Sequence, residues 1–175
     1  MSRGKEFEEQ VEKVLLQYQI AGVLRARKVD PPTRWVMGRL IPQANPFLDF
    51  VGVWTERAGR SVFFEAKETA EPRLAIGGNG ITATQRDSLV LWGLAGAVTF
   101  VLWRLRGHTF FLPGPLVASI EKERKHVRPD DCLELKPANE IQRPGRYQRL
   151  CRIEFCFLDA MRRTWPCKSN EQSSQ

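Results

Sequence analysis

The sequence predicts an α/β fold: a central mixed β-sheet flanked by helices, with an extended arm at about residues 28–47. Apolar residues recur at helical spacing in 5–18 and again from 84 to about 96, which predicts two amphipathic helices. Four short stretches rich in β-branched and aromatic residues are predicted strands: 47–55, 61–69, 97–104 and 108–112. One sheet with helices packed on it satisfies the order helix, arm, strand, strand, helix, strand, strand.

Length and charge set the broad class of protein. A chain of 175 residues is expected to form one domain with a substantial core. We expect the main body over 1–115, an extension of the same domain over 116–168 and a disordered tail over 169–175. The net charge of +7 and the isoelectric point near 9.6 favour a polyanionic partner, nucleic acid first and an acidic surface second.

The sequence contains no sign of a membrane segment. The stretch MSRGKEFEEQ is charged and lacks the apolar run of a signal peptide, and no stretch approaches the roughly 18 apolar residues of a membrane span. We therefore expect a soluble, cytoplasmic protein with no membrane partner. The spacing of the four cysteines fits no close-paired zinc site, so reduced thiols are expected at Cys132, Cys151, Cys156 and Cys167.

The first half of the chain predicts a helix, an arm and a hairpin. The helix spans Lys5–Tyr18, where Phe7 and Val11 begin an apolar stripe. Residues 28–47 contain four prolines and no clean period, which favours an extended arm before the next strand. The segment TERAGR, residues 55–60, is a predicted turn that joins the strands on either side into a hairpin.

Beyond the hairpin the pattern predicts a loop and a second helix. Three of the last four residues of 71–80 are glycine, which predicts a mobile loop. Thr84 is the predicted N-cap of the helix, with Asp87 completing a capping box, and the helix is expected to end near Gly96. In the last third the pattern weakens, and 149–157 is predicted as a further strand.

The strand SVFFEAKET carries charges on a hydrophobic background. Side chains alternate along a strand, so Glu65 and Lys67 share one face. A hairpin loop with an odd number of residues places Asp49 on that face, opposite Glu65 if the loop is centred at Arg57. A loop centred at Ala58 would place Asp49 opposite Lys67 instead. A loop with an even number of residues would place Asp49 on the other face of the sheet unless a β-bulge intervened.

Two carboxylates and a lysine on one face suit phosphodiester hydrolysis. Carboxylates that lie close together repel each other unless a cation neutralises them, and oxygen ligands suit Mg²⁺ or Mn²⁺. A bound metal lowers the pKa of its water and stabilises charge on a phosphate oxygen, while a lysine orients that water or stabilises the pentacovalent phosphorus. The alternative is a surface hairpin with an ion pair worth ~0–1 kcal/mol.

Two polar residues on the predicted helices extend this group. Gln85 shares an apolar stripe with Leu89, and Glu8 shares one with Val11. Each position is either an edge with its polar head in water or a side chain aimed at the sheet. If both are aimed inward, they converge on the same sheet as the hairpin charges, which fits a functional site.

These residues, in this order, resemble a RecU-type Holliday junction resolvase of the PD-(D/E)XK nuclease superfamily. The resemblance covers about residues 3–112 and rests on RG-xx-FE (Arg3, Gly4, Phe7 and Glu8), Asp49 followed by Gly52, FEAKET (64–69) and TQ-xxx-L (Thr84, Gln85 and Leu89). FEAKET is the most specific element. Leu48 replaces the proline that names the superfamily, and the chain after residue 115 carries none of the motifs.

The resemblance implies a restriction-endonuclease-like fold and a site for Mg²⁺, with Mn²⁺ as a substitute and no organic cofactor. The implied metal ligands are Asp49, Glu65, the carbonyl of Ala66 and, from the first helix, Glu8. Among the implied catalytic residues, Lys67 is the catalytic lysine and Gln85 a second helper beside the two carboxylates.

In that family the segment before the aspartate strand is a stalk that enters the junction, which corresponds here to residues 28–47. Basic residues neutralise phosphates, and an aromatic ring stacks on exposed bases. The candidate DNA contacts in and before this arm are Arg25, Arg27, Lys28, Arg34, Trp35 and Arg39. Further candidates elsewhere are Arg3, Arg73 and Arg86. The alternative for the arm is a solvated basic loop.

The leading interpretation is a metal-dependent, structure-specific endonuclease of DNA recombination and repair. It would be a homodimer that resolves branched DNA, the four-way junction, by paired phosphodiester hydrolysis, since two-fold symmetry presents the same site to two opposed strands. Two alternatives remain open. One is a nuclease of the same superfamily on linear or damaged duplex DNA, and the other is a non-catalytic junction-binding module that keeps the basic arm.

Overall fold

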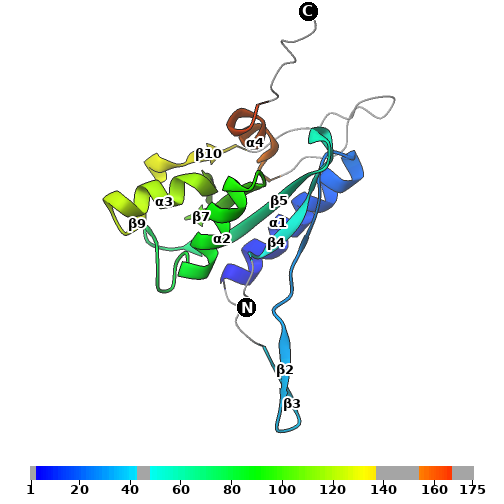
Figure 1. Cartoon of the computed structure of the whole chain (residues 1–175), viewed down its shortest axis with the longest axis vertical. Helices are drawn as coiled ribbons and strands as arrows, with labels where there is room; N and C mark the ends of the chain where they lie inside the picture. Colours follow the sequence, from blue (N-terminus) through cyan, green and yellow to red (C-terminus); the bar gives the residue numbers. More distant parts are fainter. Residues whose placement is uncertain (1–2, 43–47, 137–153, 167–175) are drawn as a thin grey trace, which may run out of the picture.

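Six strands form the central sheet of the protein in this computed structural model, which describes residues 3–42, 48–136 and 154–166. In sheet order the strands are β1 (Arg25–Lys28), β4 (Phe50–Trp54), β5 (Arg60–Thr69), β7 (Val98–Leu105), β8 (His108–Pro113) and β10 (Leu133–Leu135). The pair β5 and β7 is parallel, and the other neighbours are antiparallel. The predicted mixed α/β sheet is therefore confirmed (Figure 1).

One face of the sheet is covered by helices α1 (Arg3–Ala21) and α4 (Leu158–Thr164). Helix α1 is longer than predicted at both ends, and its apolar stripe begins with Phe7, which is buried in the same cluster as Phe64 of β5. Phe157 joins that cluster from the start of α4, a helix that the sequence pattern did not predict. Burial of aromatic side chains from three elements fixes this layer, because each removes a large apolar area from water.

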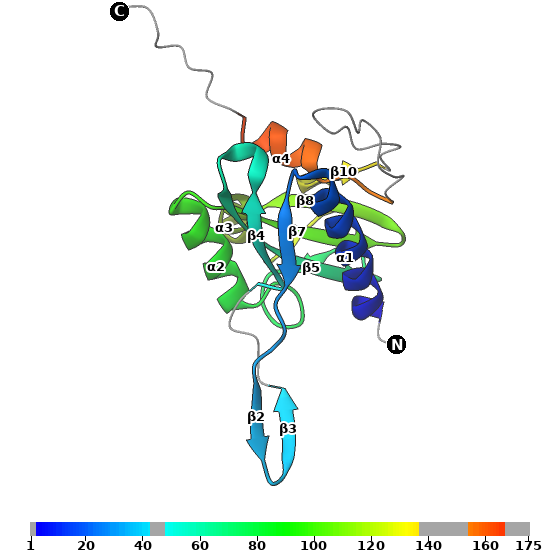
Figure 2. The ribbon, with the colours of Figure 1, turned by 90° about the vertical axis from the view of Figure 1, so that its right-hand side faces the viewer.

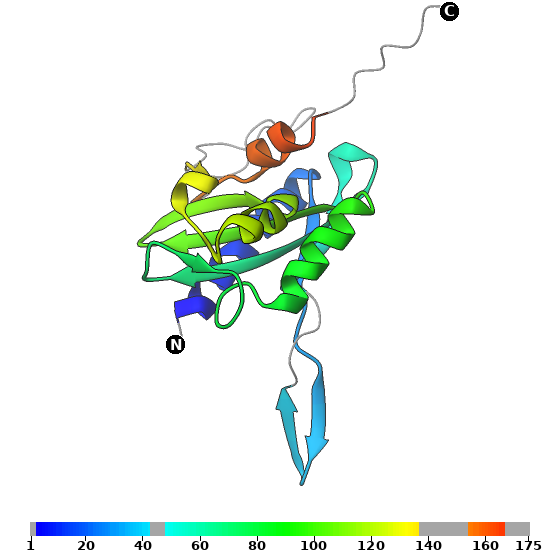
Figure 3. The same cartoon turned by 60° about the vertical axis from the view of Figure 1, so that its left-hand side comes forward.

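Helices α2 (Ala83–Leu94) and α3 (Gly114–Glu123) cover the opposite face. Their buried residues Leu89 and Val117 pack in a second cluster with Trp103 of β7. Figure 3 shows these two helices, in green and yellow-green, on the other side of the sheet from α1, in blue. The prediction of a sheet flanked by helices is confirmed, with two layers of helix.

The β4–β5 hairpin has the register that the sequence analysis described for a loop centred at Arg57. Phe50 pairs with Phe64 and Val51 with Phe63, so the register places Asp49 opposite Glu65. A short 3₁₀ turn, Thr55–Arg57, and a left-handed Ala58 connect the strands. Strand β4 is shorter than the predicted 47–55, and Asp49 lies just before it.

The arm is a β-hairpin that projects away from the body of the molecule (Figure 2). Its strands are β2 (Thr33–Val36) and β3 (Arg39–Pro42), joined at Met37 and Gly38. Both turn residues have positive φ, as a two-residue turn matched to strand twist requires. Residues 43–47 of the predicted arm lie outside the described residues.

The arm begins later than its basic residues suggested, because Arg25–Lys28 form strand β1 at the edge of the central sheet. Gly52 makes this docking possible. A Cβ at Gly52 would lie 2.2 Å from the Arg25 carbonyl oxygen and 2.4 Å from the Ala26 Cβ, far inside van der Waals contact. Strand β1 was missed because only Ala26 of its four residues is apolar, which leaves no alternating signal.

The predicted mobile loop at 71–80 contains a short strand and a hydrogen-bonded turn. Strand β6 (Leu74–Ala75) pairs with β9 (His126–Val127), and Ile76 and Ile81 are buried on either side of the glycines. Gly77 N–H donates to the Ile81 carbonyl at 2.7 Å, which closes the turn. Gly77 and Gly78 supply positive φ for this tight turn, and mobility of the loop stays a prediction.

In the described part of the last third, strand β10 joins the central sheet and α4 packs on it. Strand β10 pairs with β8, and a 3₁₀ turn, Pro129–Asp131, precedes it. The predicted strand 149–157 lies partly outside the described residues, and its described part, 154–157, is not a strand. Within the three described ranges, no helix is long and apolar enough to cross a membrane.

Candidate active site

Four predicted side chains meet on the face of the sheet that lies under α2. Glu65 and Lys67 project from β5, Asp49 precedes β4, and Gln85 lies in the first turn of α2. The Oε1 atom of Glu65 is 2.7 Å from Lys67 Nζ and accepts a hydrogen bond from Gln85 Nε2 at 2.6 Å. We refer to these four residues as the site cluster.

Backbone groups hold the two carboxylates together. The Asp49 N–H donates to Glu65 Oε2 at 3.1 Å, and the Ala66 N–H donates to Asp49 Oδ2 at 3.2 Å. These reciprocal bonds begin where the β4–β5 ladder ends, one residue beyond the pair Phe50 and Phe64. The hairpin register therefore fixes the spacing of the acids, since each carboxylate is bound by the strand that carries the other.

Gln85 is held by the capping of α2. The N-cap is Thr82 and not the predicted Thr84, which already lies inside the helix. Thr82 Oγ1 accepts from the Gln85 N–H at 3.3 Å, and Gln85 Oε1 accepts from the Thr82 N–H at 3.0 Å. The amide nitrogen of Gln85 is then free to donate to Glu65. The sequence TATQ contained this capping box, and the overlapping pattern from Thr84 to Asp87 concealed it.

Glu65 is an acid in an unfavourable place for a charge. Its exposed fraction is 0%, and its pKa is raised to about 8. Burial is the main cause, followed by the negative charge of Asp49, and the nearby Lys67 ammonium offsets these effects only in part. The site cluster is therefore short of positive charge when both acids are ionised.

The donor set of the site cluster fits a magnesium ion. Mg²⁺ takes one or two carboxylates from a protein and completes its shell with water and phosphate oxygens. Asp49 and Glu65 supply two such carboxylates, and a divalent cation would provide the positive charge that the raised pKa of Glu65 indicates is missing. Within the described residues, no group of three or more His, Cys, Asp or Glu side chains is placed to hold a metal.

Glu8 is not brought into the site cluster. Its Oε2 atom is 2.5 Å from Lys28 Nζ at the root of the arm, and this bond raises the pKa of Lys28. Lys28 also feels the negative charge of Asp49, so the ion pair lies near the cluster without joining it. The roles of Glu8 and of the Ala66 carbonyl as metal ligands stay predictions, as does a DNA contact by Lys28.

Arg25 and Arg27 lie on the sheet and share the face of the site cluster. In the β1–β4 register Arg27 is opposite Val51 and Arg25 is opposite Val53. Opposite residues of antiparallel strands point to the same side, and Val51 is two residues from Asp49. Both arginines are exposed and, within the described residues, neither forms an ion pair, so they border the site cluster with positive charge.

The remaining predicted DNA contacts lie on the arm and at separate places elsewhere in the chain. Arg34, Trp35 and Arg39 are exposed on the arm, where the pairing of Val36 with Arg39 places both arginines on the face opposite Trp35. Arg86 links two helices, because its Nη1 atom is 2.7 Å from Glu121 Oε1 of α3, and its DNA contact stays a prediction. The structure leaves Arg73 exposed beside β6. The side chain of Arg3 lies outside the described part of the chain.

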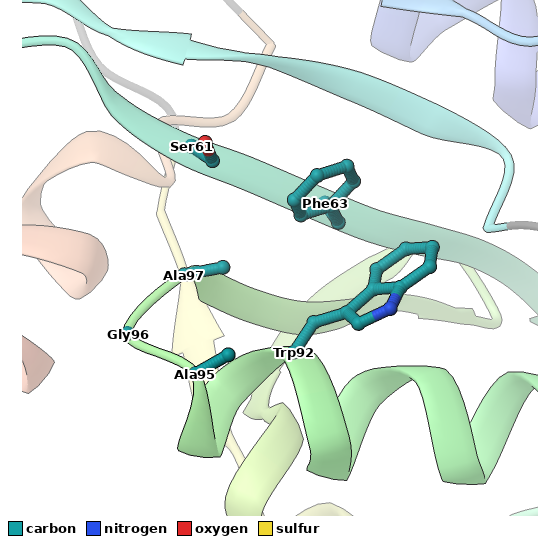
Figure 4. Close-up of a pocket in the computed structure, with 6 residues that line it drawn as sticks. All are labelled: Ser61, Phe63, Trp92, Ala95, Gly96 and Ala97. Carbon is teal, nitrogen blue, oxygen red and sulfur yellow. The ribbon is translucent and has the colours of Figure 1, made fainter.

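A shallow pocket of about 350 Å³ continues the same face away from the arm (Figure 4). It is lined by Ser61, Phe63, Trp92, Ala95, Gly96 and Ala97. Phe63 of β5 and Trp92 of α2 face each other with ring centroids 4.5 Å apart. This face of the sheet is therefore polar at Glu65 and apolar at Phe63, the preceding residue of β5 on the same face.

Comparisons with known proteins give a remote structural likeness. No protein-family model matches the chain, and no curated protein matches it. Among solved structures, the chain is similar to Hjc from Archaeoglobus fulgidus, a Holliday junction resolvase from an archaeal hyperthermophile. The two are 21% identical with a TM-score of 0.47, over 75% of this chain and 95% of that chain. A likeness of this size carries no argument about function.

Proposed function

We propose that this protein is a metal-dependent endonuclease of the PD-(D/E)XK type that resolves four-way DNA junctions in cytoplasmic recombination and repair. The observation that carries the proposal is the site cluster, in which two carboxylates, a lysine and a glutamine are joined on one face. The motif resemblance centred on FEAKET supports the same chemistry. The arm leaves the sheet beside the cluster, because the Val29 N–H donates to the Asp49 carbonyl at 2.7 Å.

Each member of the site cluster has a chemical role in hydrolysis of a phosphodiester. Mg²⁺ held by Asp49 and Glu65 would supply, when bound, an activated water and stabilisation of charge on the phosphate. Lys67 has 21% of its side chain exposed, so its ammonium reaches the surface of the cluster and donates to a phosphate oxygen or to the attacking water. Gln85 orients Glu65 through its 2.6 Å hydrogen bond.

The arm favours a junction over a plain duplex as the substrate. Trp35 is 68% exposed at a distance from the body, on a two-stranded hairpin that has little stability of its own. The open centre of a four-way junction presents base faces on which an aromatic ring stacks, whereas a continuous duplex presents only its grooves and phosphates. Arg34 and Arg39, on the other face of the hairpin, would neutralise the phosphates around that centre.

Resolution of a junction requires two opposed cuts, so we propose that the enzyme is a homodimer. The apolar surface beside the pocket is the surface on which we place the second copy. Leu91 and Leu94 on α2 are 62% and 80% exposed, and Val53 of β4 is also exposed. Exposed apolar residues grouped next to an apolar pocket are typical of an interaction surface.

The test of this function is a gel assay with three labelled DNAs of matched sequence: a four-way junction, a duplex and a single strand. With Mg²⁺ we expect paired nicks in the junction alone, and with EDTA we expect no cutting. Cutting of all three DNAs would favour the general nuclease. Tight junction binding without cutting, in Mg²⁺ or Mn²⁺, would favour the non-catalytic binding module.

Asp49→Asn tests the site cluster directly. The change removes a ligand charge that faces the phosphate, so we expect cleavage to fall at least ~1,000-fold while junction binding stays equal or becomes tighter. Asp159→Asn is the matched control, because Asp159 is an exposed acid on α4 that bonds Arg162. Normal cutting by Asp49→Asn would show that the metal site has been assigned wrongly.

A further inference from the structure

A small two-stranded ribbon outside the central sheet has a buried inner face and an exposed outer face. Strands β6 and β9 are antiparallel, with Leu74 opposite Val127 and Ala75 opposite His126. Leu74 and Val127 are fully buried in the cluster beneath α2 and α3. Because side chains alternate along a strand, the residues on either side of this pair point outward.

Three basic residues gather on the outer face of this ribbon. Continued by one residue beyond the strand ends, the register brings Arg73 opposite Arg128, and His126 lies on the same face, two residues from Arg128. The Arg128 Nε atom is 3.4 Å from His126 Nε2. We call Arg73, His126 and Arg128 the basic ribbon. Sequence reasoning selected Arg73 alone, because its neighbours lie more than fifty residues further along the chain.

The basic ribbon concentrates positive charge that the fold neutralises only in part, because the Asp131 carboxylate acts on Arg128 and His126 from one side. Like charges directly opposite each other on two strands destabilise the pairing. Within the described residues, neither Arg73 nor Arg128 has a carboxylate at ion-pair distance, and Asp131 is bound by Arg124 and by the Arg128 N–H. Burial and the charges of these arginines lower the pKa of His126, which agrees with their closeness. An anionic partner would relieve this repulsion.

The ribbon is fixed in place close to the site cluster. Arg73 follows Lys67 by six residues, so their Cα atoms are within about 20 Å of each other even for a fully extended chain. On the other side, the Ile81 N–H donates to the Ala75 carbonyl at 2.8 Å, one residue before the N-cap of α2. At about 3.4 Å per nucleotide along one strand, 20 Å corresponds to roughly six nucleotides.

We propose that the basic ribbon binds the sugar–phosphate backbone of the DNA arm that leads away from the site cluster. This inference rests on the proposed function, because the DNA it binds is the substrate of that site. It extends the DNA contact surface into the last third of the chain, which carries none of the family motifs. The contact is with phosphates, so it positions the DNA without selecting its sequence.

The test compares two variants that lose the same charge. Arg73→Gln/Arg128→Gln removes two charges from the basic ribbon, and Lys122→Gln/Arg163→Gln removes two exposed charges from α3 and α4. Junction binding is measured in EDTA over a series of salt concentrations, so that no cutting occurs. We expect the slope of log K against log salt to be less negative by about 2 in the ribbon variant, because each phosphate contact contributes about −0.9 to that slope. Its hydroxyl-radical footprint should lose protection at a position no more than about six nucleotides from the cleavage site.

The control variant should keep the wild-type slope and footprint. Equal slopes for the two variants, or an unchanged footprint in a ribbon variant that melts like the wild type, would overturn the proposal. These outcomes are separate from failure of the proposed function. A wild-type protein that binds the junction in EDTA and cuts nothing in Mg²⁺ would overturn the endonuclease, and the slopes would still decide the role of the ribbon.

Discussion

The carboxylate of Glu65 lies fully buried beside that of Asp49, and this position determines how the protein responds to pH. Its pKa is about 8 in the folded chain, against an ordinary value of 4.5. Between these two values the folded protein keeps a proton that the unfolded chain has lost. The free energy of unfolding of the metal-free protein should therefore fall as the pH rises from about 4.5 to about 8.

Glu65→Gln removes this penalty without changing the shape of the side chain. At pH 8.5 in EDTA we expect the variant to unfold with a free energy about 2–5 kcal/mol higher than the wild type, and at pH 5 we expect the two to be similar. Urea denaturation at both pH values measures this difference. The control is Glu9→Gln, at an exposed acid of α1, which should show no such pH dependence. If the two proteins differed in unfolding free energy by the same amount at both pH values, the raised pKa could not be that of Glu65.

The same residue links metal binding to pH. In the proposed metal site Mg²⁺ would bind the ionised carboxylate of Glu65, so its stabilisation of the wild type should be larger at pH 8.5 than at pH 6. In Glu65→Gln this increase in melting temperature should be lost. A stabilisation by Mg²⁺ that survives in Glu65→Gln would place the ion elsewhere in the molecule.

Among the elements, the arm is the one in which a substitution is expected to change DNA binding without changing the stability of the fold. Trp35 is exposed, and across the hairpin it pairs with Leu40, which is also exposed. Trp35→Ala should leave the melting temperature unchanged and weaken junction binding by about 10-fold, because stacking of one base on an aromatic ring contributes about 1–3 kcal/mol. Duplex binding, measured in the same EDTA buffer, should change less than 2-fold. Leu40→Ala is the matched control. Equal losses on junction and duplex would argue against insertion of the arm.

The elements also show what the sequence could and could not predict. The hairpin of β4 and β5 was predictable because period-2 alternation and the length of the turn together limit the register, and one of the two odd loops is the observed one. The start of α2 was predicted two residues late, because two capping patterns overlap in 82–87. Strand β1 and helix α4 were not predicted. Both are short, and their place in the fold is decided by packing rather than by local pattern.

At the scale of the whole molecule, the limits of sequence reasoning are set by long-range contacts. Four members of the predicted site converge because Asp49, Glu65 and Lys67 belong to one hairpin. The fourth, Gln85, lies at the start of the next helix along the chain. The basic ribbon could not be predicted, since its strands are separated by about fifty residues and only the fold pairs Leu74 with Val127. Glu8 shows a second limit of the same kind. Its place on the helix stripe predicted that it points toward the sheet, but the pattern could not show that its partner there is Lys28.

The proposed dimer is the property of the whole molecule that decides how a junction is resolved. Light scattering at micromolar concentration should give twice the chain mass for the wild type. Leu91→Glu/Leu94→Glu should give a monomer, because burial of a charge on the apolar surface of α2 costs several kcal/mol. The matched control is Leu16→Glu/Ile20→Glu, which alters two exposed apolar residues of α1 on the other side of the sheet.

Coupling of the two cuts provides a functional readout of the same dimer. On a supercoiled plasmid that extrudes a cruciform, paired cuts within one complex yield linear DNA, whereas one cut alone relaxes the cruciform and yields a nicked circle. The wild type and the α1 variant should give linear product, and Leu91→Glu/Leu94→Glu should give nicked circles. A wild type that is monomeric, or an α2 variant that remains dimeric and still linearises the plasmid, would move the interface away from α2.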